Sequence, residues 1–149
     1  MPDSLTWHVD GLRDLGERLR KLGSPGAQRI ANAMTGAAAQ VIKKRARRNI
    51  EASPSIETGS LRDAVIVKKV PKSQTTLTSE HIVTVRGRGK VSKKTGKKQP
   101  EAPHGALVEF GTVHMPAEPY LRPAIDEGRQ EAVDAMKDRG ASRLTKAGA

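Results

Sequence analysis

The chain of 149 residues contains no cysteine. Without thiols the protein can form neither a disulfide nor a thiolate zinc site, and a cysteine nucleophile is excluded. Aromatic residues make up only 2% of the sequence and are limited to Trp7, Phe110 and Tyr120. The core must therefore be built from aliphatic side chains and many alanines, which bury little area each. Such a thin core favours association with further copies of the chain.

Long apolar runs are also missing. No stretch reaches the ~20 residues needed to span a bilayer, and the opening MPDSLTWHVDG lacks the regions of a secretory leader. We therefore expect no membrane contact and folding in the cytoplasm. The length fits a single domain over residues 1–149, in which we expect 1–8 and 140–149 to be flexible.

Recognisable catalytic motifs are absent. The sequence has no Walker loop, no G-x-S-x-G and no dinucleotide-binding glycine motif. Its four histidines do not pair at helical spacing with one another or with a carboxylate in a zinc-site pattern. Glu109 alone lies within an apolar segment, where an isolated Glu is more often outward-facing or salt-bridged than catalytic. We predict a protein that is not an enzyme and has no cofactor or metal.

Basic residues outnumber acidic ones by 27 to 16, which gives a net charge of +11. Two segments without acids hold the excess: KKRARR at 43–48 has five bases, and RGRGKVSKKTGKK at 86–98 has seven. Two local patches on an otherwise neutral chain indicate contact with a polyanion at defined places, and nucleic acid is the leading candidate.

The hydrophobic pattern predicts an α+β fold with two N-terminal helices, a small antiparallel sheet of about three to four strands and one C-terminal helix. We place the first helix over 9–22 and the second over 25–49, ended by Ser53-Pro54. Strands are predicted at 61–70, 75–86 and 105–111, a long mobile basic loop at 87–103, and a final helix with Pro123 in its first turn that frays after Arg139.

Each basic segment has two interpretations. The KKRARR segment falls in the last turns of the predicted second helix, so it is either a DNA contact or a solvated helix end whose cations stabilise the helix dipole. The loop either lies along DNA phosphates without reading sequence, or is a solvated loop that only raises solubility. Its candidate DNA-facing residues are Arg86, Arg88, Lys90, Lys93, Lys94, Lys97 and Lys98.

Three short motifs follow one another along the chain: Thr58-Gly59-Ser60-Leu61-Arg62, Val108-Glu109-Phe110-Gly111-Thr112, and Pro116-Ala117-Glu118-Pro119-Tyr120-Leu121-Arg122-Pro123-Ala124. Together with the leading segment GLRDLGERLRKL and its Ala-rich continuation, they resemble the neck and tail-completion family of long-tailed bacteriophages, whose members are minor tail components. The resemblance covers residues 9–138, and its most specific part is the last motif.

The motif residues also have physical roles of their own. Gly59 and Gly111 permit positive φ, while Thr58 and Thr112 can bond nearby backbone groups. Pro119 and Pro123 fix φ around an aromatic, an aliphatic and an Arg side chain, which suits a protein interface. The alternative is that Phe110, Tyr120 and Leu121 close the core of the monomer. The candidate interface residues are Thr58, Gly59, Leu61, Arg62, Glu109, Phe110, Gly111, Thr112, Pro119, Tyr120, Leu121, Arg122 and Pro123.

The resemblance implies a structural protein of the virion that forms a ring at the head-tail junction around the DNA channel, with six subunits favoured over twelve. The implied partners are copies of itself, head-closure, tail-terminator or tail-tube proteins, and genomic DNA contacted without regard to sequence. Its implied location is the virion, after assembly in the host cytoplasm. The alternative is a sequence-independent DNA-binding protein of a prophage or mobile element.

Overall fold

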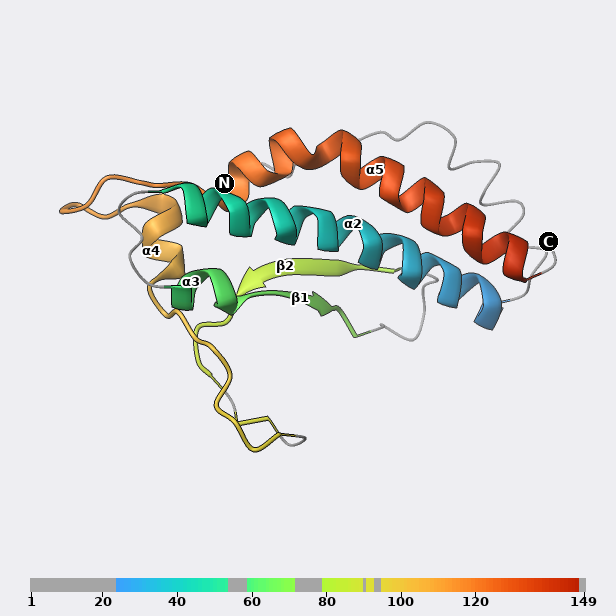
Figure 1. The fold of residues 1–149 in the computed structure, drawn as a ribbon, viewed down its shortest axis with the longest axis horizontal. Helices are drawn as coiled ribbons and strands as arrows, with labels where there is room; N and C mark the ends of the chain where they lie inside the picture. Colours follow the sequence, from blue (N-terminus) through green and yellow to red (C-terminus); the bar gives the residue numbers. More distant parts are fainter. Residues whose placement is uncertain (1–23, 54–58, 72–78, 90, 93–94, 148–149) are drawn as a thin grey trace.

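A computed structural model of the chain describes residues 24–53, 59–71, 79–89, 91–92 and 95–147. The predicted first helix at 9–22 lies outside this part. Along the chain the elements are α2 (Ser24–Ala52), α3 (Gly59–Ala64), β1 (Val65–Lys69), β2 (His81–Val85), α4 (Gly105–Phe110) and α5 (Leu121–Lys146). Figure 1 shows α2 in the middle, with α5 running antiparallel along one side and the hairpin of β1 and β2 on the other. The α+β prediction is confirmed.

The pairing of α2 with α5 forms most of the core. Buried side chains recur on α2 at intervals of three to five residues, and they are Ile30, Met34, Ala39, Ile42, Ala46 and Ile50. The facing positions on α5 are mostly small and are spaced by four, including Ala124, Gly128, Ala132 and Gly140. A Cβ added at Gly128 would lie 3.0 Å from Ile42 Cδ1. Large side chains on one helix therefore fill the space that small residues leave on the other, which gives dense packing without aromatics.

The second predicted helix is confirmed, with bounds slightly wider than expected. It continues to Ala52, so its last turn contains no basic residue and the KKRARR segment lies about one turn earlier. Since the helix dipole acts mainly on the last turn, it does not account for these cations.

Two of the three predicted strands are confirmed, both shorter than expected. β1 and β2 form an antiparallel pair in which Val65 lies opposite Val85 and Lys69 opposite His81. The first residues of the predicted strand at 61–70 instead form α3, because Leu61 and Ala64, three positions apart, both face the core. Residues 75–78 of the other predicted strand lie outside the described residues.

The third predicted strand, at 105–111, is wrong. This segment folds as α4, with Gly105 and Glu109 buried and the intervening Leu107 exposed. In a strand the three positions would lie on one face, whereas in a helix positions 105 and 109 share a face and position 107 lies on the other side. A short apolar run does not distinguish the two conformations by periodicity. The sheet in the described part of the chain therefore has two strands instead of three or four.

The C-terminal helix runs further than predicted. Pro123 lies in its first turn as expected, but α5 passes Arg139 and ends at Lys146. Gly140 approaches Met34 closely, since an added Cβ would lie 3.0 Å from the Met34 sulfur. Leu144 joins Met34 and Ile30 in a second apolar cluster. The helix is therefore anchored by packing beyond the point where the sequence suggested fraying.

Replacing Leu144 with Ala tests this anchoring. We expect Leu144→Ala to lower the free energy of unfolding by about 2 kcal/mol, because it removes a buried side chain and leaves a cavity beside Met34. Urea unfolding followed by circular dichroism measures the change. Arg143→Ala, at an exposed neighbouring position, is the matched control and should stay within about 0.5 kcal/mol of the parent. Equal free energies of unfolding for the two variants would show that Leu144 does not anchor the end of α5.

Candidate functional site

The carboxylate of Glu109 is buried at the start of α5. Its Oε2 accepts hydrogen bonds from the backbone N–H groups of Tyr120 and Leu121, both at 2.8 Å, and its Oε1 accepts one from Arg122 at 3.0 Å. The residue is only 6% exposed. Three donors and the positive end of the α5 dipole thus stabilise the negative charge of this side chain away from water.

This contact satisfies the whole N-terminus of the helix. An α-helix leaves its first four N–H groups without intrahelical partners. In α5 three of these belong to Tyr120, Leu121 and Arg122, and the fourth position is Pro123, which has no N–H. Tyr120 at the N-cap position makes no side-chain capping bond. Glu109 therefore caps α5 from a distant point in the sequence, and its predicted outward-facing or salt-bridged position is wrong.

Tyr120 lies in the core beside this cap. It is fully buried, and its hydroxyl donates a 2.9 Å hydrogen bond to the carbonyl of Gly105. Gly105 admits this contact because a Cβ there would lie 2.9 Å from Val85 Cγ1 and 3.1 Å from the tyrosine hydroxyl. Burial, with a smaller contribution from the charge of Glu109, raises the pKa of Tyr120 to about 12. For Tyr120 the core interpretation holds within this chain.

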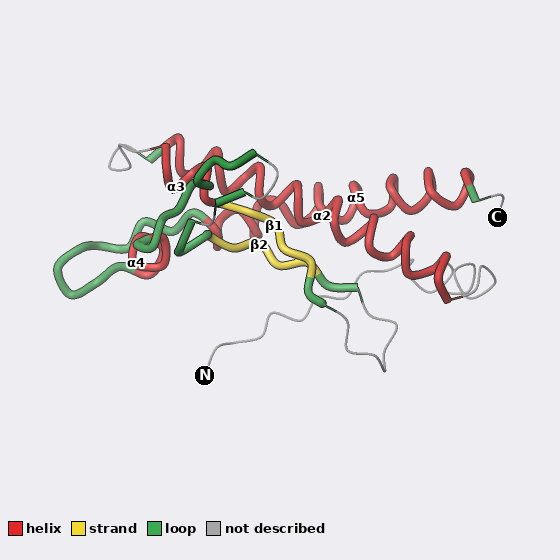
Figure 2. Tube along the Cα trace, turned by 90° about the horizontal axis from the view of Figure 1, so that it is seen from below, coloured by secondary structure: helices red, strands yellow, loops and turns green. Residues whose placement is uncertain are grey.

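Gly111 turns the chain sharply after α4. Its φ is +74°, as predicted for this position, and an added Cβ would lie 2.8 Å from the backbone nitrogen of Ala117. Thr112 N donates to the carbonyl of Met115 at 2.8 Å, and Thr112 Oγ1 accepts a bond from His114 N. The bond from Glu118 N to Val108 O, at 2.8 Å, closes the loop at its base. The loop projects from the helices in both views (Figure 1, orange; Figure 2).

Apolar side chains cover α4 and the projecting loop on the outside. Phe110 is 69% exposed and Val113 is 97% exposed, and Leu107 and Met115 are exposed beside them in the sequence. The guanidinium of Arg122 lies over the ring of Phe110, 5.9 Å from its centroid. We call Leu107, Phe110, Val113 and Met115 the apolar tip. Exposed apolar side chains this close together along the chain are candidates for an interaction surface.

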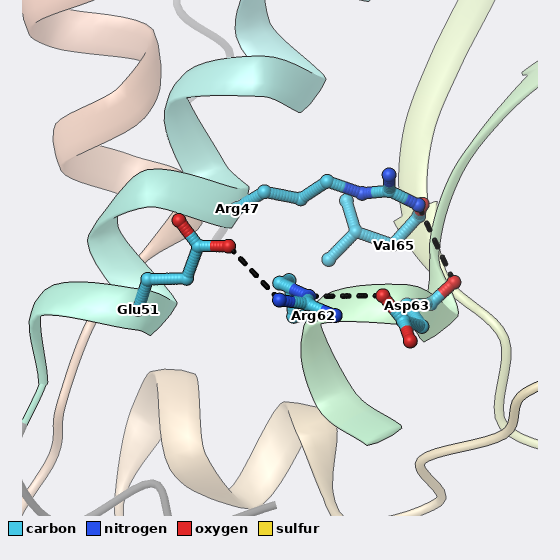
Figure 3. Close-up of polar contacts among 5 residues, drawn as sticks. All are labelled: Arg47, Glu51, Arg62, Asp63 and Val65. Carbon is cyan, nitrogen blue, oxygen red and sulfur yellow. Dashed lines mark hydrogen bonds and ion pairs between the residues drawn. The ribbon is translucent and has the colours of Figure 1, made fainter. Parts of the chain in front are cut away.

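Arg62 of the first motif forms an ion pair that joins α3 to α2 (Figure 3). Arg62 pairs with Glu51 of α2 at 3.1 Å and with Asp63 at 2.9 Å. The hydrogen bond from Arg62 lowers the pKa of Asp63 below its ordinary value. Arg47 crosses from α2 and donates to the carbonyl of Val65 at 3.2 Å. Arg62 therefore holds α3 against the end of α2.

The predicted interface residues divide by exposure. Phe110 is exposed and so does not close the monomer core, in contrast to Tyr120. Gly59 starts α3 without a positive φ, so its predicted conformation is wrong, and Thr58 lies outside the described residues. The buried members are Leu61, Glu109 and Tyr120; the half-buried ones are Arg62, Gly111, Leu121 and Pro123; and the exposed ones are Gly59, Phe110, Thr112, Pro119 and Arg122.

Some residues of the two basic segments form ion pairs or hydrogen bonds within the fold, whereas others are exposed. Arg45 pairs with Glu131 and Glu127 of α5 at 2.9 and 3.7 Å, and Arg47 bonds backbone carbonyls. In the loop, which contains a β-bridge between Val91 and Lys98, Lys98 pairs with Glu101. Of the predicted DNA-facing residues, Arg88, Lys97 and Lys98 are exposed and Arg86 is half-buried; Lys90, Lys93 and Lys94 lie outside the described part.

A groove brings cations of both basic segments together. Lys43 of α2, Lys68 of β1, and Arg86 and Arg88 after β2 line it, with a volume of about 430 Å³. Partial burial, then the charges of Arg47 and Arg86, lower the pKa of Lys43. Sequence reasoning considered Lys43 only as part of the KKRARR segment and did not consider Lys68, because nothing in their spacing shows that α2 and β1 pack beside the start of the loop.

A sequence profile of a phage protein family, described as the bacteriophage HK97-gp10 tail component, matches residues 13–111. The chain belongs to the HK97-gp10-like family. The match includes the first motif and all of the second except Thr112, and it ends at Gly111, before the third. The predicted resemblance to phage tail proteins is thereby confirmed at the family level. Comparisons with curated proteins and with solved structures gave no match.

Two kinds of feature are not found in the described part of this HK97-gp10-like chain. No three His, Asp or Glu side chains within it come close enough together to bind a metal ion. No helix in the same residues is both long and apolar enough to cross a bilayer.

Removing the charge of Glu109 tests the cap of α5. An amide at this position offers a single acceptor oxygen and turns donors toward the N–H groups. We therefore expect Glu109→Gln to lower the free energy of unfolding by roughly 3 kcal/mol. Glu127→Gln, on the exposed face of α5 with a loose ion pair, should change it by less than about 0.5 kcal/mol. Chemical unfolding of both variants measures the difference. A free energy of unfolding that Glu109→Gln lowers no more than Glu127→Gln does would argue against the cap.

The buried phenol gives a second test, because Tyr120 is the only tyrosine of this family member. Its pKa is about 12 in the folded protein against an ordinary value of 10.0. Its contribution to stability is thus complete below pH 10.0 and is lost as the pH rises through about 12, because the unfolded chain releases the proton first. Phenolate absorbance should titrate near 12 in buffer and near 10.0 in urea. A midpoint near 10.0 while the circular dichroism stays native would be inconsistent with the buried phenol.

Proposed function

We propose that this protein is a neck or tail-completion subunit that forms a ring at the head-tail junction of a tailed phage, around the channel through which DNA leaves. Six copies are favoured, with twelve as the alternative. Its role is structural and involves no catalysis. The neighbouring rings would be head-closure, tail-terminator or tail-tube proteins, joined in the virion after assembly in the host cytoplasm.

The apolar tip is the observation that carries this proposal. A rigid, exposed group of apolar side chains is costly in a monomer, since about 25 cal/mol is gained for each Å² removed from water. Phe110 at the end of α4 and Val113 in the loop that follows are the most exposed members, and this loop is closed at its base by backbone bonds. An ordered tip of this kind is suited to insertion into a neighbour without a large loss of conformational entropy.

The occupant that we propose for the tip contact is the next copy of the same chain. The tip projects from one end of the molecule (Figure 2), so that a contact with a different face of an identical neighbour would be heterologous. Repetition of a heterologous contact generates a closed ring when the rotation between copies divides a full turn. The family identity supports this arrangement, since a tail component works in contact with other virion proteins.

A second candidate is a free, sequence-independent DNA-binding protein of a prophage or mobile element. The groove of Lys43, Lys68, Arg86 and Arg88 favours it. The two candidates differ in location, because a ring subunit is present in purified particles in fixed stoichiometry. Cryo-electron microscopy of particles of the source phage distinguishes them: density for this chain between portal and tail supports the ring, and its absence from complete virions overturns it.

Variants of the tip test the contact itself. Phe110→Ser and Val113→Ser leave the buried core intact, so we expect normal folding but a loss of infectious particles of at least about tenfold when the variants replace the parent chain, because truncating central interface anchors costs roughly 2 kcal/mol or more. Val91→Ser changes another exposed apolar residue, on the basic loop, and should leave assembly unchanged. Normal particle yield with both tip variants would rule out the tip as a subunit contact.

A further inference from the structure

We infer that the groove lined by Lys43, Lys68, Arg86 and Arg88 binds the backbone phosphates of double-stranded DNA, without regard to sequence. The inference deepens the proposed function and rests on it for the presence of virion DNA. It differs from a contact by the loop alone, because half of the binding side chains come from α2 and β1.

The groove is formed by three separate parts of the chain. Lys43 comes from the second half of α2, Lys68 from β1, and Arg86 and Arg88 from the residues that follow β2. The backbone N–H of Arg86 donates to the carbonyl of Ala64 at 2.9 Å, which fixes the start of the loop at the junction of α3 and β1. Cations on a helix and a strand are held in place more rigidly than cations on a loop, so that the site is largely formed before the ligand arrives.

Among the described residues, no acidic side chain lines this groove. Its remaining lining residues are Gln40, Ile66, Val67 and Gln99. Among the residues that the structure describes, none of the four cations forms an ion pair, although Arg86 donates one bond to the carbonyl of Pro100 at 3.1 Å. Arg45, Arg62 and Lys98 elsewhere are paired with carboxylates. Four cations without an ion pair to a described residue therefore lie together in this groove, with the carboxylate of Glu101 close enough to feel the charge of Arg88.

The electrostatics of Lys43 support an anionic ligand. Burial and the neighbouring charges of Arg47 and Arg86 lower its pKa, so its ammonium group is destabilised in the free protein. A phosphate in the groove would lie near several cations at once and would remove this repulsion. Arg side chains bind phosphate with two parallel N–H donors, and Lys adds a point charge with three.

The lining favours duplex backbone over other forms of nucleic acid. Contacts from Lys and Arg to phosphate fix position without reading bases. In the part of the chain that the structure describes, no aromatic side chain lines the groove, whereas proteins that bind single strands stack bases on aromatic rings. Exposed Lys97 on the same loop would extend the positive surface along the duplex.

Fluorescence anisotropy with a labelled duplex of mixed sequence, measured over a range of salt concentrations, tests the site. The unmodified protein should bind, with an affinity that falls steeply as salt rises. Lys43→Gln/Lys68→Gln should weaken binding at least about tenfold and make the slope of log affinity against log salt shallower by about two, one for each phosphate that is no longer neutralised. Lys137→Gln/Lys146→Gln makes the same change of net charge on exposed positions of α5 and should retain the parent slope.

The outcomes separate this inference from the ring. Equal weakening with both double variants, or no binding even at low salt, overturns the groove as a DNA site. Preference for a single strand of the same length overturns it as well. So does a change of self-association in sedimentation without a change in DNA affinity, which would make the groove a protein contact. Thermal unfolding verifies that the variants fold. Each of these failures leaves the position of the chain in particles unaffected, because microscopy tests that position independently.

Discussion

The carboxylate of Glu109 at the N-terminus of α5 is the contact on which the other features of this structure depend. It joins α4 to α5 through three backbone N–H groups. The same contact holds Tyr120 over Gly105 and sets the base of the loop that carries the apolar tip. A buried charge is tolerated only when its hydrogen bonds are satisfied. The position of Glu109 is therefore strongly specified, and this also fixes how the projecting loop is placed relative to the core.

The sequence predicts the elements whose pattern is long and regular. The stripe from Ile30 to Ile50 on α2 and the alternation in β1 and β2 were sufficient for correct assignment. The segment 105–111 was not, because a run of seven residues satisfies both helical and extended patterns and only tertiary packing of Gly105 and Glu109 decides. One signal for the cap was present: tyrosine is not a usual N-cap residue, and Tyr120 at the N-cap of α5 makes no side-chain capping bond, so an acceptor from elsewhere in the chain was required.

The sequence predicts how much positive charge each basic segment carries, but not where the fold places each cation. The two basic segments are evident in the sequence, yet Arg45 and Arg47 stabilise the fold while Lys43, in the same short segment of α2, lines the groove. Residues two positions apart on a helix point in different directions, and the consequence depends on what packs on each side. Because α5 covers one side of α2 and the hairpin the other, neighbouring cations in one short segment have different partners.

The distribution of the large apolar side chains connects folding with assembly. Small residues on α5 allow α2 to approach closely, so the pair of helices is dense without aromatics. Tyr120 then occupies the junction of α4 and α5, while Phe110 remains outside although burial would remove its apolar surface from water. Phe110, exposed at the end of α4, would gain about 25 cal/mol for each Å² of apolar surface that a partner covered. Under the proposed function the next subunit buries this apolar surface. Closure of the ring would then also raise the free energy of unfolding of each subunit.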